Sequence, residues 1–164
     1  MKFQGIGIKE AKKDDFEALL KLWKKATDYH HKLDKKRFLS GEERENFLKK
    51  RLKEFLAKKR RNRKILLAVK KEKPIGLFIA SIRKSPNYLR ERKIGEIEVA
   101  FIEEKFRRKG IGKMLFEELV KWFKKRKINL IEVLVDSRNE IGISAYKKYG
   151  FKEVAKRMAL TLSE

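Results

Sequence analysis

The stretch Arg107-Arg108-Lys109-Gly110-Ile111-Gly112-Lys113 decides how the rest of this chain is interpreted. It joins an apolar run to a segment whose apolar residues have helical spacing. The two glycines allow a sharp turn and let a ligand approach the backbone closely. The first amides of a helix have no internal acceptors and lie at the positive end of the helix dipole, so they bind anions. With four basic residues around the turn, the stretch predicts a diphosphate site.

Two other phosphate-binding motifs do not fit this stretch. A Walker A loop ending at Lys113 requires glycine at Arg107 and serine or threonine at Met114. A dinucleotide-binding fingerprint starting at Gly110 requires its third glycine at Leu115. Short glycine motifs are weak signals, so a helix start with incidental charge remains an alternative at this point.

The order of predicted elements indicates an α/β (α+β) fold. Apolar periodicity predicts helices over 14–30, 40–56, 110–126 and 139–149, and strands over 2–9, 64–71, 75–83, 93–103 and 130–135, with one or two closing strands in 151–162. The second and third strands form a hairpin. A helix between the fourth and fifth strands implies a crossover and a local parallel pair. We expect one domain over residues 1–164, with a mixed sheet of six to seven strands and four helices on both faces.

A second motif, Asn139-x6-Tyr146-x3-Gly150-Phe151, follows the first. The two motifs, in this order, resemble the GNAT superfamily of N-acetyltransferases, whose signature after the fourth strand is Gln/Arg-x-x-Gly-x-Gly/Ala. Arg107, Gly110 and Gly112 meet that signature. Gly142 departs from the family, which often has alanine there. The resemblance implies the GNAT fold, in which strands four and five splay apart, often at a bulge.

The resemblance also implies acetyl-CoA as co-substrate and a primary amine as acetyl acceptor, joined in a ternary complex without a metal. The pyrophosphate would be held by Arg107, Arg108, Lys109, Gly110, Ile111, Gly112 and Lys113. Phe101 and Ile102 would offer main-chain hydrogen bonds to the pantetheine arm, with Asn139 beside it. Tyr146 would also contact the cofactor and donate a proton to the departing thiolate.

An ammonium must lose a proton before it can attack, and a carboxylate can take that proton. Glu96 and Glu98 are two residues apart on the fourth strand, so they are expected on one face. The resemblance places a catalytic or substrate-binding glutamate at one or the other position, and we favour Glu98, closer to the splay point. The alternative is that each is a strand carboxylate paired with a lysine or arginine.

The net charge of +23 is unevenly distributed, with +11 over residues 49–73 and +8 over 105–127. Such a charge attracts polyanions. A solvated surface is the ordinary explanation, and binding to RNA or a ribosomal surface is the second, although aromatic residues are sparse in 49–73. Three functions therefore stay open: an N-acetyltransferase, a non-catalytic acyl-CoA-binding protein of this fold, and an RNA- or ribosome-associated module.

The sequence lacks cysteine, a signal peptide and any apolar run long enough for a membrane helix. We expect a cytoplasmic protein without a membrane partner. The bias toward lysine, glutamate, arginine and isoleucine resembles that of a heat-adapted archaeon or bacterium. Edge-strand dimers are common in the family, so a homodimer is a further expectation. The sequence does not identify the acceptor.

Overall fold

The structure is a computed structural model that describes residues 5–57 and 61–162. Part of the first predicted strand, residues 2–4, lies outside the described residues. The chain divides into two compact units, residues 1–134 and 135–164, and each is described by itself.

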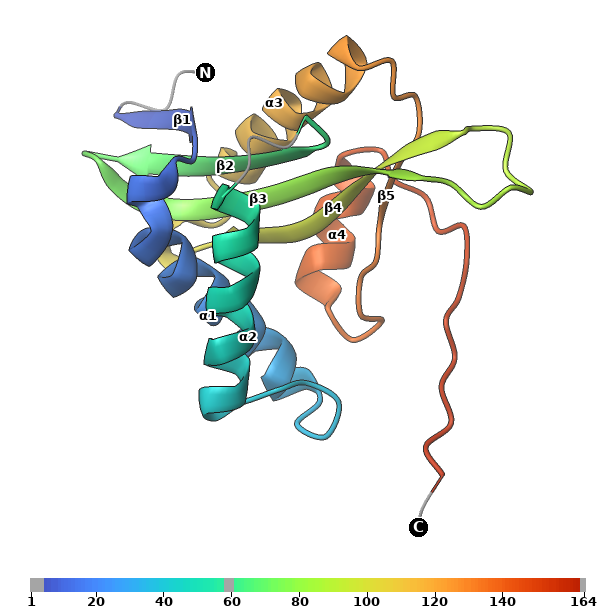
Figure 1. Cartoon of the computed structure of the whole chain (residues 1–164), viewed down its shortest axis with the longest axis horizontal. Helices are drawn as coiled ribbons and strands as arrows, with labels where there is room; N and C mark the ends of the chain where they lie inside the picture. The colour runs from blue at the N-terminus through green and yellow to red at the C-terminus, as the bar shows by residue number, and fades with distance from the viewer. Residues whose placement is uncertain (1–4, 58–60, 163–164) are drawn as a thin grey trace. The chain divides into compact units, whose positions relative to one another are not determined.

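A five-stranded sheet organises the first unit (Figure 1). Its strands lie in sequence order: β1 (Ile6–Glu10), β2 (Arg63–Lys70), β3 (Lys73–Lys84), β4 (Lys93–Ile102) and β5 (Ile131–Val133). The first four are antiparallel to their neighbours, and β5 is parallel to β4. The predicted crossover and parallel pair of the fourth and fifth strands are therefore confirmed.

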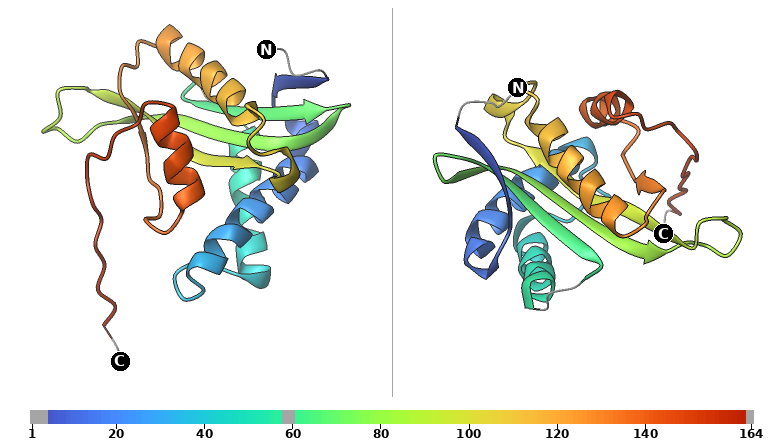
Figure 2. Two further views of the ribbon diagram at one scale, coloured as in Figure 1. Left: turned by 180° about the vertical axis from the view of Figure 1, so that it is seen from behind. Right: turned by 90° about the horizontal axis from the view of Figure 1, so that it is seen from above.

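Three helices cover this sheet. Figure 2 shows α1 (Phe16–Leu33) and α2 (Gly41–Ala57) on one face and α3 (Ile111–Lys125) on the other. Two short 3-10 turns, Lys13–Asp15 and Glu104–Phe106, precede α1 and α3. Within the described ranges, no helix is both long and apolar enough to span a membrane.

The core lies between the sheet and its helices. On the α1–α2 face, apolar side chains of both helices pack against β2 and β3, among them Leu19, Trp23, Leu48, Leu67, Leu77 and Ile79. On the other face, α3 approaches β4 so closely that a Cβ at Gly95 would lie 2.4 Å from the Phe123 ring. Glycine at position 95 therefore lets α3 pack directly on the strand from which the site is built.

The second unit contains α4 (Glu140–Lys148), the fourth helix of the described residues. Asn139 begins it by accepting a hydrogen bond from the Gly142 amide at 2.9 Å. Gly150, at φ +94°, follows its end, as expected for a helix terminated in a left-handed conformation.

The predicted number of strands is wrong. The described residues form five strands rather than six to seven, because residues 151–162 have no regular secondary structure. Their apolar side chains Val154, Met158, Leu160 and Leu162 are exposed. Apolar alternation predicts that a segment can be a strand, but a strand also needs a partner to satisfy its backbone groups. No such partner follows from a local pattern.

Candidate active site

The site begins at an irregularity in β4. Ile79 pairs with Val99, whereas the next residue of β3, Ala80, pairs with Ile97. Glu98 is therefore an extra residue, and β4 has a β-bulge there. On its other side, β4 pairs with β5 only from Gly95 to Ile97. From Glu98 onward, the described part of β5 gives β4 no partner, so the two strands separate at the bulge.

The backbone of β4 beyond the bulge has a definite orientation. The Glu103 amide donates to the Ile75 carbonyl at 2.9 Å, so it faces β3. Because successive residues of an antiparallel strand face opposite neighbours, the backbone groups of Phe101 also face β3. Those of Ala100 and Ile102 face the edge that β5 has left. Ala100 and Ile102, rather than Phe101, are thus oriented for main-chain hydrogen bonds to a ligand in that gap.

Arg107 fixes the turn that follows. Its Nε donates to the Ile102 carbonyl at 2.9 Å, and its guanidinium lies 5.7 Å from the centre of the Phe101 ring. The next residue, Arg108, has φ +58°, and Gly110 has φ +76°. A non-glycine residue in the left-handed region costs about 1–2 kcal/mol. Such strain is often found where a loop is shaped for a ligand.

The start of α3 presents unused hydrogen-bond donors. The first backbone bond into the helix runs from the Met114 amide to the Gly110 carbonyl at 3.1 Å, and no side chain caps this end. Among the described residues, the amides of Ile111, Gly112 and Lys113 thus have no acceptor. Three convergent donors at the positive end of a 15-residue helix are what a diphosphate requires. The predicted loop therefore fits the predicted ligand.

Glu98 lies at the bulge on the α1–α2 side of the sheet. Its carboxylate is 3.5 Å from the Arg63 guanidinium and 4.0 Å from that of Arg51, and its side chain is 21% exposed. Both guanidiniums lie over the Phe55 ring, at 3.7 Å and 4.6 Å from its centre. Glu98 is thus held by arginines, yet remains open to solvent where β4 leaves β5.

Glu96 lies where β4 and β5 are still paired. Arg83 donates to Glu96 at 3.1 Å and to Glu132 of β5 at 3.1 Å. Arg83 therefore links β3, β4 and β5 through their side chains. Both glutamates are thus paired with arginine, and they differ in position, because Glu96 lies beside the paired part of β5 and Glu98 lies at the bulge.

Sequence reasoning missed Glu103, which is buried at the end of β4. Lys25 of α1 donates a hydrogen bond to its carboxylate. Burial by itself would raise the pKa of Glu103, but the hydrogen bond and charge of Lys25 outweigh it, and the net pKa is lowered. This ion pair anchors the end of β4 immediately before the turn. No local signal could have revealed it, because the partner lies 78 residues earlier.

In the second unit, the capping of α4 explains the unusual Gly142. A Cβ at that position would lie 2.6 Å from Nδ2 of Asn139 and 2.9 Å from its Cγ. Glycine therefore makes room for the Asn139 side chain over the first turn. The cap uses Oδ1 of Asn139 and leaves its amide nitrogen as a donor.

Tyr146 packs among aromatic rings of the same unit. Its ring centre is 5.5 Å from that of Phe151 and 6.5 Å from that of Tyr149, both in edge-to-face arrangements. Burial, assisted by Tyr149, raises the pKa of Tyr146 to about 12. The hydroxyl therefore remains protonated at neutral pH and can donate a hydrogen bond or a proton.

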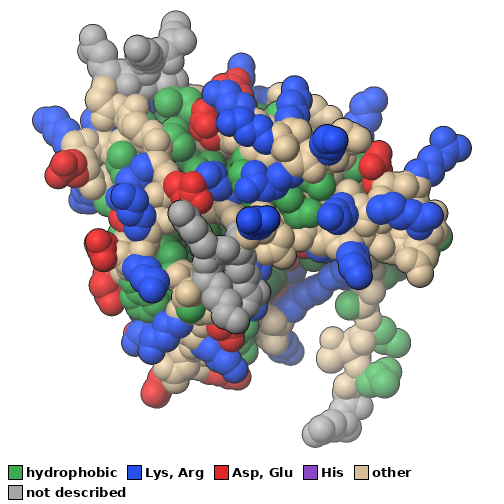
Figure 3. Space-filling model, turned by 45° about the horizontal axis from the view of Figure 1, so that its top comes forward, with side chains coloured by type: hydrophobic (Ala, Val, Ile, Leu, Met, Phe, Trp, Pro, Cys, Tyr) green, Lys and Arg blue, Asp and Glu red, His purple; other side chains and the backbone are tan. Residues whose placement is uncertain are grey.

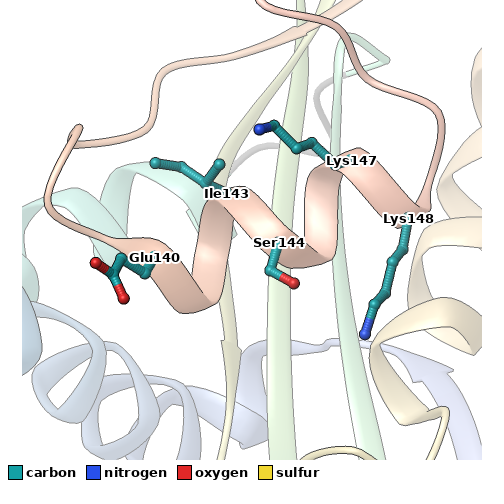
Figure 4. A pocket seen from close by; sticks show the side chains of 5 residues that line it. All are labelled: Glu140, Ile143, Ser144, Lys147 and Lys148. Carbon is teal, nitrogen blue, oxygen red and sulfur yellow. The ribbon is translucent and has the colours of Figure 1, made fainter.

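A hollow of about 530 Å³ borders one side of α4, lined by Glu140, Ile143, Ser144, Lys147 and Lys148. Figure 4 shows these side chains pointing in different directions along the helix rather than toward one point. It is therefore a shallow surface rather than a converging site. Within residues 5–57 and 61–162, no group of three or more histidine, aspartate or glutamate side chains is placed to hold a metal ion.

The sequence profile of the Acetyltransferase (GNAT) family matches residues 18–151. An uncharacterized N-acetyltransferase of Methanocaldococcus jannaschii is 33% identical over 81 residues, which cover 49% of this chain and 35% of that protein. An N-acetyltransferase 9-like protein of Caenorhabditis briggsae is 36% identical over 83 residues, covering 49% and 40%. Each match thus spans well under half of the relative's length.

Solved structures share the fold. A Bacillus halodurans protein aligns with a TM-score of 0.85 at 22% identity, covering 96% of this chain and 99% of that one. An aminoglycoside 6'-N-acetyltransferase from Acinetobacter haemolyticus aligns with a TM-score of 0.75 at 22% identity, covering 96% of this chain and 99% of that one. Another such enzyme, in complex with a CoA-based bisubstrate analogue, aligns with a TM-score of 0.75 at 18% identity, covering 96% of this chain and 98% of that one. The profile match extends over most of the sequence and includes both motifs, so the chain belongs to the GNAT family of acetyltransferases.

Proposed function

We propose that this protein transfers an acetyl group from acetyl-CoA to a primary amine within a ternary complex. The observation that carries this proposal is the opening of β4 from β5 at Glu98, which leads along the strand to the three free amides of α3. A strand edge with unused backbone groups suits an extended, amide-containing arm. The helix start suits the diphosphate at the end of that arm.

Each part of the donor would contact a different part of the chain. The amides of Ile111, Gly112 and Lys113 would hold the pyrophosphate, within the field of the exposed cations of the turn. The main chain of Ala100 and the amide of Ile102, whose carbonyl accepts from Arg107, would bond the pantetheine arm. The free amide nitrogen of Asn139 is a further donor for it. Arg107 keeps the turn in shape through Ile102 rather than reaching out.

Glu98 is the base in this proposal. It accepts a proton from the acceptor ammonium, and the resulting amine attacks the thioester carbonyl carbon. The C–S bond then breaks, and the Tyr146 hydroxyl donates its proton to the departing thiolate. The nitrogen of the new amide loses its extra proton, which restores the Tyr146 hydroxyl. The enzyme's main contribution is to hold the two reactants in line, since orientation supplies much of the rate in such reactions.

The surroundings of Glu98 favour an acceptor that carries its own negative charge. Two of the structural neighbours are aminoglycoside acetyltransferases, and aminoglycosides are polycations. Here Arg51 and Arg63 stand beside Glu98, and the whole chain has a net charge of +23. Both features repel a polycation. A carboxylate or phosphate near the reacting amine would instead bind the two guanidiniums.

A screen of acetyl-CoA consumption tests this function, with amino acids, acidic peptides, polyamines and aminoglycosides as acceptors. We expect amines with a neighbouring acidic group to be used best. With the best acceptor, Glu98→Gln should lower kcat about 100-fold, because it removes the general base, while the acetyl-CoA Kd stays nearly unchanged. Glu96→Gln is the matched control, and its kcat should stay within a few-fold of the parent value.

Each outcome of the screen decides one point. Binding of acetyl-CoA without its consumption by any acceptor would instead support the non-catalytic function. Faster consumption with aminoglycosides would refute the acceptor class. Unchanged turnover in Glu98→Gln would exclude Glu98 as the base.

The role of Tyr146 is tested separately. Tyr146→Phe should lower kcat about tenfold or more, because the thiolate loses its proton donor. Since the pKa of Tyr146 is about 12, the kcat of the parent enzyme should show no loss from its ionisation between pH 7 and 10. Steady-state kinetics over this range measure both effects, and an equal kcat for the two proteins would rule out this role.

A further inference from the structure

A second concentration of positive charge lies at the other end of α3. A depression of about 440 Å³ is lined by four cations, Arg61, Lys93, Lys125 and Arg126, and by Asn62, Ile82 and Ile128. These residues belong to the segment before β2, the β3–β4 hairpin and the end of α3. In the view of Figure 3, lysine and arginine side chains are spread widely over the surface, with acidic ones scattered among them.

The depression is held together by main-chain contacts. The Arg126 Nε donates to the Arg61 carbonyl at 3.0 Å, and the Ile82 amide donates to the Asn62 carbonyl at 2.7 Å. The Arg126 guanidinium lies 4.7 Å from the centre of the Trp122 ring. The segments around Arg61 and Arg126 therefore meet at a defined place, through residues 65 positions apart.

In the described part of the chain, the four cations lack a carboxylate partner. Among residues 5–57 and 61–162, none of the four forms an ion pair. Arg83, on the same hairpin as Lys93, instead pairs with Glu96 of β4 and Glu132 of β5. The dipole of α3 favours cations at its end and accounts for Lys125 and Arg126. It does not account for Arg61 or Lys93, which come from other elements. Mutual repulsion of the four like charges is reduced when an anion lies among them.

We propose that this depression binds the phosphate backbone of a single-stranded nucleic acid, separately from acetyl-CoA. Phosphates at regular spacing match several cations set around one concavity, and guanidiniums bind phosphate in a bidentate manner. Ile82 provides apolar contact for sugars and bases, and Asn62 provides an amide. Trp122 is only 6% exposed, so it supports Arg126 rather than stacking on bases. Binding is therefore driven by charge and is independent of base sequence.

Fluorescence anisotropy with a labelled 12-nucleotide oligouridine tests this site on the full chain. The triple variant Arg61→Gln, Lys93→Gln, Lys125→Gln should weaken binding at least tenfold at 100 mM NaCl. It should also lower the slope of log K against log salt by about 2, since each phosphate contact on a single strand contributes about 0.7. Arg126 is left intact because its side chain holds the Arg61 backbone.

The control variant Lys35→Gln, Lys36→Gln, Arg37→Gln removes the same charge from an exposed segment between α1 and α2, and it should change oligouridine affinity by less than about twofold. Circular dichroism and the acetyl-CoA Kd should match the parent in both variants, which separates this site from the proposed function. Equal weakening in both would show diffuse attraction without a site. Tighter binding to phosphatidylserine vesicles than to oligouridine, or no oligouridine binding at 100 mM NaCl, would also overturn the proposal.

Discussion

The two ends of α3 are both basic, but they are built on different physical principles. At its start, backbone amides of Ile111 to Lys113 supply the donors, and the helix dipole adds to them. At its end, the dipole has the opposite sign, and the charge comes from side chains that three separate segments bring together. The first end has a fixed geometry suited to one diphosphate. The second end has flexible charged side chains without a fixed arrangement of donors, which suits a repeating polyanion.

This contrast indicates how one chain can use positive charge twice. A site made of backbone amides depends on the conformation of the turn and weakly on salt. A site made of exposed side chains depends strongly on salt and on the number of charges. Substitutions can therefore affect one end of α3 without affecting the other.

The largest expected effect at the first end comes from Gly110→Ala. Gly110 has φ +76°, and a Cβ in this conformation costs about 1–2 kcal/mol. If this free energy disfavours the binding conformation of the turn, the acetyl-CoA Kd rises about 5- to 30-fold, because that conformation is populated less. Isothermal titration calorimetry measures this change, and the affinity for oligouridine at the second end should be unaltered.

Gly41→Ala is a matched control, because Gly41 has φ +54°, begins α2 and has open space around its Cβ position. The free energy of unfolding of this variant should fall by about 1 kcal/mol, while its acetyl-CoA affinity stays the same. A parallel loss of affinity in both variants would mean that the conformation of the turn at 110 is not what binds the diphosphate.

A smaller effect is expected from Lys25→Met, which removes the partner of Glu103 before the turn. The pKa of Glu103 is lowered in the folded protein, so the ion pair stabilises the fold above the ordinary carboxyl pKa of 4.5 and this stabilisation is lost as pH falls through the lowered value. The free energy of unfolding should fall by about 1 kcal/mol at pH 7, and the difference should shrink toward pH 2.

Urea unfolding of both proteins across this pH range measures the difference. A difference that is constant with pH would show that Lys25 acts by packing alone.

Local sequence patterns predicted the helices, whose backbone hydrogen bonds are internal, and the strands that pair with a near neighbour in sequence. The β2–β3 hairpin and the spacing of helices α1 to α4 follow from apolar periodicity and turns, and the parallel β4–β5 pair follows from the crossover between them. The prediction of closing strands was wrong because such strands would need a partner that is distant in sequence. Residues 151–162 have the alternation of a strand, yet in the described structure they lack a neighbouring strand to bond.

The candidate site divides in the same way. The loop at 107–113 was predicted as an anion site because glycine, helix start and charge are adjacent in sequence. The contacts of Glu96 and Glu98 were left as alternatives, and the register settled where each lies: one beside a paired strand and one at a bulge. Whether Glu98, Asn139 and Tyr146 act as proposed stays a prediction.

The sequence by itself predicted the donor half of the proposed function, since a diphosphate site at a helix start needs only neighbouring residues. The tertiary structure alone decided the bulge at Glu98, the anchoring of Glu103 by Lys25 and the meeting of Arg61 with Arg126. Each of these joins residues far apart in the chain, and their contact depends on how sheet and helices pack. No local pattern of charge or hydrophobicity encodes that packing.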